Sequence, residues 1–158
     1  MGEDISARCE AIEKCYEFML AYAGQGLGGN EGSNSSAQVR DYLERAADAI
    51  LGLAEAYAAI VKRESSNRAG HYSAFLGVLQ RDAQDSLAAI QLVLAQNTIS
   101  SQLIDNLNAS IHLRALLTDL FLLAEILKPQ PTREKPATAE ESNFCLLFAC
   151  RAGTVCPS

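Results

Sequence analysis

Residues 113–127 read LRALLTDLFLLAEIL, and eleven of these fifteen residues are apolar. An α-helix has 3.6 residues per turn, so apolar residues that alternate at intervals of four and three lie along one side of it. This stretch contains such a row, which predicts a helix that packs into the core of its own fold. The members of the predicted seam are Leu113, Leu117, Leu120, Ala124 and Leu127.

A second apolar row follows the same helix, roughly opposite the seam, and begins two residues before the quoted stretch. A helix that is apolar on two sides is either fully central or presents one side to another surface. We expect the second row, together with apolar residues near residue 146, to be an interaction face. The predicted face consists of Ile111, Ala115, Leu122, Ile126, Phe144, Leu147 and Phe148.

The composition limits the class of partner. The 158 residues carry a formal net charge of −6, and 49% of them are apolar, which is enough for a core and favours one domain. The acidic balance argues against a nucleic-acid surface and against adhesion to anionic membranes, since both need clustered Lys and Arg. The apolar runs are too short to cross a bilayer, and residues 1–10 lack the apolar stretch of a secretory signal. We therefore expect a cytoplasmic protein without a membrane span.

Four amphipathic segments predict an all-α protein, an up-down antiparallel four-helix bundle over residues 1–128. In the second segment the apolar rhythm places Arg40 on the outer side, and in the first it places Cys9 on the seam, where we expect it in the core. The predicted helices span about residues 4–23, 36–63, 70–96 and 100–128, with a Gly- and Ser-rich loop at 24–35.

Residues 129–158 differ from the rest, because a Pro-containing charged linker leads into an apolar segment that carries three of the five cysteines. Cys145, Cys150 and Cys156 have the spacing Cys-x4-Cys-x5-Cys. Structural zinc sites prefer closer pairs and a second pair, and redox sites prefer Cys-x-x-Cys. We favour an apolar segment that packs on the bundle or on a partner; metal binding, thiol chemistry and membrane attachment remain alternatives.

Polar residues interrupt the fourth predicted helix. Asn106 and Ser110 fall on an extension of its seam, where they either fix the register of the helices or line a polar pocket in the core. His112 shares a side with Asp105 and Asp119, but each carboxylate is seven residues away, about 10.5 Å along the axis. One metal ion cannot join groups so far apart, so we predict a solvated polar side there. No motif predicts a catalytic residue or a cofactor.

These patterns favour a small acidic helical bundle that acts by binding another protein, or a second copy of itself as a dimer. Its size, acidity and helix content are similar to those of flagellar and type III secretion chaperones. This likeness in architecture, which no shared motif accompanies, implies a chaperone-like, adaptor or regulatory role. Two alternatives remain open. One is a metal- or thiol-dependent protein that uses the C-terminal cysteines, and the other is an enzyme or small-ligand binder with a pocket at Asn106 and Ser110.

Overall fold

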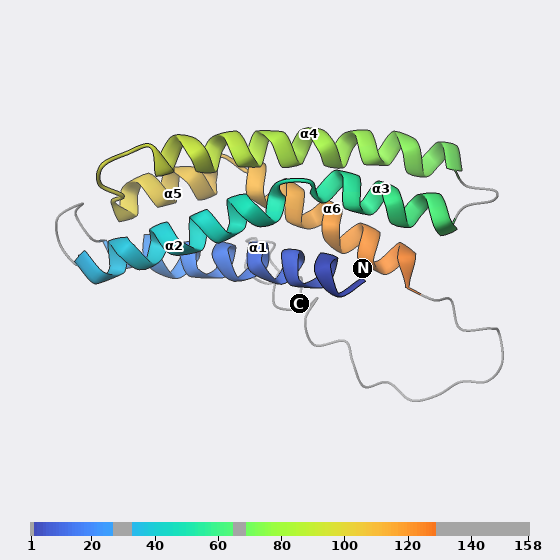
Figure 1. Cartoon of the computed structure of the whole chain (residues 1–158). Helices are drawn as coiled ribbons and strands as arrows, with labels where there is room; N and C mark the ends of the chain where they lie inside the picture. The colour runs from blue at the N-terminus through green and yellow to red at the C-terminus, as the bar shows by residue number, and fades with distance from the viewer. Residues whose placement is uncertain (1, 27–32, 65–68, 129–158) are drawn as a thin grey trace, which may run out of the picture. The chain divides into compact units, whose positions relative to one another are not determined.

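The computed structural model describes residues 2–26, 33–64 and 69–128 of the chain. These residues form α-helices and no β-strand, which confirms the all-α class (Figure 1). Met1–Leu127 is one compact unit and Lys128–Ser158 is a second, of which only Lys128 is described. The helices are α1 (Gly2–Ala23), α2 (Ser33–Ile50), α3 (Leu53–Glu64), α4 (Ala69–Leu94), α5 (Ser101–Ala109) and α6 (His112–Leu127).

The segment predicted as one helix over 36–63 is broken between α2 and α3. Gly52 has a φ of 73°, in the left-handed region that glycine enters at little cost and that ends a helix. Arg8 of α1 donates from Nη1 to the carbonyl oxygens of Ala49, at 3.1 Å, and Leu51, at 2.5 Å. These carbonyls have lost their partners within the helix, so the guanidinium stabilises the break.

The segment predicted as one helix over 100–128 is also broken, although no glycine or proline marks the position. Ser110 ends α5, and its hydroxyl donates to the carbonyl oxygen of Leu107 at 2.6 Å. Ile111 follows with a φ of 65° and accepts the first hydrogen bond of α6 from the amide of Ala115, at 2.8 Å. A β-branched residue in the left-handed region is strained, so packing elsewhere holds this break.

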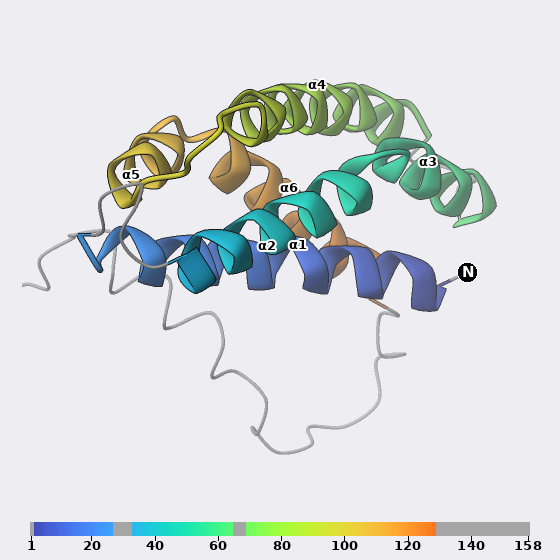
Figure 2. The ribbon, with the colours of Figure 1, turned by 60° about the vertical axis from the view of Figure 1, so that its left-hand side comes forward.

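The two breaks redirect the chain between two straight helices, α1 and α4. Within this unit α2 packs mainly on α1 and α3 on α4, and in the same way α5 packs mainly on α1 and α6 on α4. Figures 1 and 2 show α1 and α4 on opposite sides, with α2–α3 and α5–α6 passing between them. Each broken pair therefore contributes to the packing of both straight helices.

The core follows the predicted rhythm closely in α2, α3 and α4 and less closely at the C-terminal end of α6. Ala124 is exposed, whereas Leu127 is partly buried and packs against the core. The prediction that the seam includes Ala124 was therefore wrong. The buried residues of α6 are Leu113, Leu116, Leu117, Leu120 and Leu123.

Two further residues lie in surroundings that differ from the prediction. Cys9 is only partly buried, with its Sγ 3.5 Å from the hydroxyl oxygen of Tyr57, while Cys15 is completely enclosed. Arg40 is half-buried, because the last turn of α4 lies against this part of α2. Its guanidinium donates to the carbonyl oxygens of Leu94 and Gln96, each at 2.7 Å, and so covers the C-terminal end of α4.

Candidate interaction surface

An apolar row lies along α6 on the side opposite its buried residues. Ile111 is 55% exposed, Leu122 46% and Ile126 41%, and Ala115 between them is half-buried. Ile111 directly precedes α6, and we call these four residues together the outer face of α6. Their exposure is what an outward-facing row requires. The other predicted members of the interaction face, Phe144, Leu147 and Phe148, lie outside the described residues.

The row has two apolar parts, Ile111 with Ala115 and Leu122 with Ile126, and the polar Thr118 lies between them. Single exposed aliphatic residues are normal on soluble proteins, whereas several on one side of a helix are a candidate site of interaction. Thr118 lies within the row, and its hydroxyl donates to the carbonyl oxygen of Arg114 in the same helix at 2.8 Å. This hydroxyl is therefore satisfied within α6 and does not need a partner from outside.

One acidic residue beside the row faces inward. Asp119 of α6 meets Asp82 of α4, and burial followed by this adjacent carboxyl raises the pKa of Asp119 to about 6. Its Oδ2 is shielded from solvent and accepts no hydrogen bond from a described residue. The buried hydroxyl of Ser86, one turn after Asp82 on α4, also lacks a described partner. No local pattern in the sequence predicts this pair, because only the packing of α6 on α4 brings the two carboxyls together.

The predicted polar site in the core is wrong. Asn106 is exposed, and its Oδ1 accepts from Nε2 of Gln102 at 3.4 Å. Ser110 is the end of α5 and bonds within its own helix. The break at residues 110–111 rotates α5 relative to α6, so the seam of α6 does not extend to Asn106. The residues of α5 that are buried are Ser101, Ile104 and Leu107.

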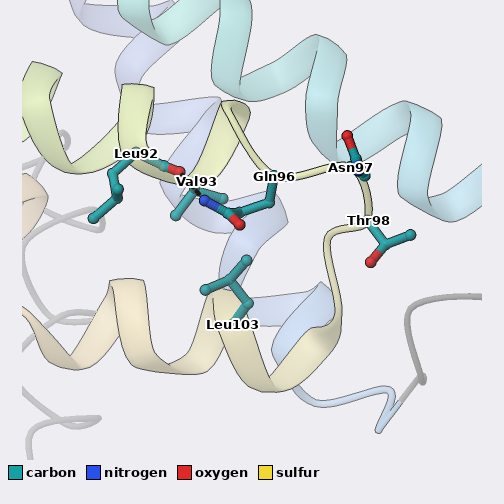
Figure 3. A pocket seen from close by; sticks show the side chains of 6 residues that line it. All are labelled: Leu92, Val93, Gln96, Asn97, Thr98 and Leu103. Carbon is teal, nitrogen blue, oxygen red and sulfur yellow. Dashed lines mark hydrogen bonds between the residues drawn. The ribbon is translucent and has the colours of Figure 1, made fainter.

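A shallow groove of about 540 Å³ lies between the C-terminal end of α4 and α5 (Figure 3). Its rim includes Leu92, which is 68% exposed. The connection between the two helices is fixed by Tyr22, whose hydroxyl donates to the carbonyl oxygen of Ile99 at 2.7 Å, and by Arg40. The lining residues carry no charged side chain, so the groove is suited to contact rather than to acid–base chemistry. They are Leu92, Val93, Gln96, Asn97, Thr98 and Leu103.

The described cysteines are poorly placed for thiol chemistry. Burial raises the pKa of Cys15 to about 12 and also raises the pKa of Cys9. A thiol of high pKa is seldom the thiolate that attacks a substrate or binds a metal. Within residues 2–26, 33–64 and 69–128, no three His, Cys, Asp or Glu side chains are grouped so that they could hold a metal ion. Cys145, Cys150 and Cys156 lie outside these ranges, so their role stays a prediction.

No helix among the described residues is both long and apolar enough to pass through a bilayer. Comparison of the chain with protein-family models, with curated proteins and with solved structures finds no match.

Proposed function

We propose that this chain is a small cytoplasmic helical-bundle protein, of adaptor, regulator or chaperone-like type, that acts by binding protein through the outer face of α6. In this proposal α1, α2–α3, α4 and α5–α6 are the four antiparallel members of an up-down bundle. The observation that carries the proposal is the exposed row at Ile111, Leu122 and Ile126, opposite the buried side of the same helix.

The energetics support a contact at this face but require more surface than two side chains. Burying Leu122 and Ile126 would contribute about 3–6 kcal/mol, at 1.5–3 kcal/mol for each side chain. Association costs several kcal/mol in lost translational and rotational freedom, so these two residues alone would not hold a partner. The remaining surface along α6 has to take part in the contact as well.

A double variant tests the proposal. Leu122→Asp with Ile126→Lys places opposite charges four residues apart on the outer face and leaves the net charge unchanged. The matched control is Gln80→Asp with Gln84→Lys, which places the same charges at the same spacing on the exposed side of α4. Each purified protein is used as bait in a native lysate, and its own association is followed by sedimentation velocity.

We expect the wild type and the α4 control to retain a bound partner, either a second copy of the chain or another protein. The outer-face variant should lose that partner. Circular dichroism should show that all three proteins have the same helix content. Equal binding by all three proteins would contradict a binding role for the outer face. Loss of helicity in the outer-face variant alone would show that Leu122 and Ile126 belong to the core.

A further inference from the structure

The junction between α5 and α6 contains no residue that favours a break. Residues 101–127 include neither glycine nor proline, and their pattern predicts one continuous helix. Ile111 nevertheless has a φ of 65°, whereas the break between α2 and α3 falls on Gly52, where a positive φ carries little steric cost. The break between α5 and α6 is therefore opposed by its own sequence, and the other break is not.

A shielded amide adds a second cost at the same junction. The side chain of Asn108, three residues before Ile111, has its nitrogen and its oxygen shielded from water, with no hydrogen-bond partner among the described residues. In a continuous helix Asn108 and His112 would be four residues apart on one side, where an amide and an imidazole can form a hydrogen bond. Straightening the junction would therefore relieve the strain at Ile111 and give the amide a neighbour to bond.

The place of α6 at the end of its compact unit allows it to be exchanged between chains. It is the last helix of Met1–Leu127, and it packs mainly on α4 and less extensively on α1 and α5. If residue 111 became helical while α5 stayed on α1, α6 would leave its own α4 and uncover its buried side. The buried residues on that side are Leu113, Leu116, Leu117, Leu120 and Leu123. A second copy that opens in the same way uncovers an identical α4, which can bury them again.

We infer that Ser110 and Ile111 form a hinge through which two copies of this chain exchange α6. In the exchanged dimer α5 and α6 are one helix, and α6 of each copy packs on α4 of the other copy. Identical copies offer identical surfaces, so the contacts of α6 with α4 are rebuilt between chains while the junction loses its strain. Short connections under strain favour such an exchange. The outer face of α6 stays exposed in both forms, so the exchange is independent of the function proposed above.

The equilibrium between monomer and exchanged dimer tests the hinge. The full chain is held in moderate urea over a range of protein concentrations until the ratio is constant, then returned to buffer and separated by size-exclusion chromatography. The dimer should increase with concentration and persist after dilution, because closing again requires the buried leucines of α6 to be exposed. Ile111→Gly should lower the dimer association constant about a hundredfold, since the relief of strain is lost at two junctions and is worth about tenfold at each. The control is Ala115→Gly, which lies within a helix in both forms and should leave the constant unchanged.

Paired cysteines identify the exchange itself. Asp82 of α4 and Asp119 of α6 lie beside one another, so Asp82→Cys with Asp119→Cys places two thiols at the contact between these helices. After oxidation the isolated dimer should carry this disulfide between its two chains, and the isolated monomer should carry it within one chain. Non-reducing electrophoresis separates the two products. Each single cysteine variant, which retains the five native cysteines, is the control.

Several outcomes would overturn the inference. A wild type that stays monomeric at every concentration would do so, and so would an Ile111→Gly dimer as stable as that of Ala115→Gly. A dimer whose paired cysteines link only within one chain would show that the copies associate without exchange. Leu122→Asp with Ile126→Lys should still form the exchanged dimer, and its loss in that variant would mean that the outer face holds the copies together. A failure of the hinge and a failure of the outer face as a binding site are therefore separate results.

Discussion

Gly52 and Ile111 each hold a left-handed backbone conformation at a direct junction between two helices, and their side chains suit it very differently. Gly52 has no Cβ, and a Cβ built there would have no neighbour within 4 Å. The positive φ, and not a lack of space, is therefore what favours glycine at residue 52. Ile111 adopts almost the same φ with a β-branched side chain. Its strain is retained at a residue of the outer face, where the exposed side chain would be available to a partner.

The strain predicts that substitutions at Ile111 and Gly52 change the free energy of unfolding in opposite directions. Ile111→Gly should stabilise the fold by about 0.5–1 kcal/mol, because glycine relieves about 1–2 kcal/mol of left-handed strain and loses part of that gain to its flexible unfolded chain. Gly52→Ala should destabilise the fold by about 1–2 kcal/mol, since alanine takes on the same strain. Urea unfolding monitored by circular dichroism measures both changes.

A glycine placed within the helix serves as the control. Ala115→Gly, one turn into α6, should cost about 1 kcal/mol from helix propensity alone. If Ile111→Gly behaves like Ala115→Gly, residue 111 is not strained and the break between α5 and α6 has another cause.

Among the helices, two arginines cover the C-terminal ends of neighbouring elements. Arg8 of α1 donates to carbonyls at the end of α2, and Arg40 of α2 donates to carbonyls at the end of α4. A cation at this end of a helix satisfies free carbonyls and opposes the negative end of the helix dipole. These contacts join elements that are distant in the sequence, so they help to define where α2 and α4 end.

Removing the contact between Arg40 and the C-terminal end of α4 should lower the free energy of unfolding. Arg40→Ala should destabilise the fold by about 1–2 kcal/mol, because two charge-assisted hydrogen bonds are lost, one to the half-buried carbonyl of Leu94 and one to the exposed carbonyl of Gln96. The control is Arg45→Ala on the same helix, where an exposed ion pair with Asp41 is worth at most about 0.5 kcal/mol. Denaturant unfolding of both variants compares these costs. Equal effects would mean that Arg40 behaves as an ordinary surface residue.

For the whole molecule, the carboxyl pair between α4 and α6 links stability to pH. The pKa of Asp119 rises from its ordinary value of 3.8 to about 6, first because of burial and then because of Asp82. Between these values the folded protein binds more protons than the unfolded chain does. Stability therefore falls as pH rises through this window, and the charged carboxyl penalises the fold above it.

Asp119→Asn should remove this penalty. A neutral amide has no charge to desolvate and can donate a hydrogen bond to Asp82, so the variant should be more stable than the wild type at pH 7. Near pH 4 the difference should largely disappear. Urea unfolding from pH 4 to pH 8 measures the two curves, with the exposed Asp85→Asn as the control. A constant difference between the curves of Asp119→Asn and the wild type would contradict a proton-linked origin.

The sequence by itself determined the all-α class and most of the core. The intervals of four and three place Val39, Leu43, Leu53 and Tyr57 in the interior, where the structure has them. The same geometry separates the outer face of α6 from its buried side, so the exposure of Leu122 and Ile126 follows from the angle between them and Leu120. Local periodicity suffices here because burial in a helix depends on which side a residue occupies. Binding at that face stays a prediction.

Only the tertiary structure decided where the helices break and which polar groups meet. Ile111 has no local signal for a left-handed conformation, and packing of α5 on α1 and α6 on α4 imposes it. That break exposes Asn106, which a continuous helix would have buried. Arg40 caps the C-terminal end of α4, and Asp119 lies beside Asp82; both contacts join residues that are far apart in the chain. Periodicity gives the direction of a side chain from its own helix, but the partner it meets depends on where the other helices end and cross.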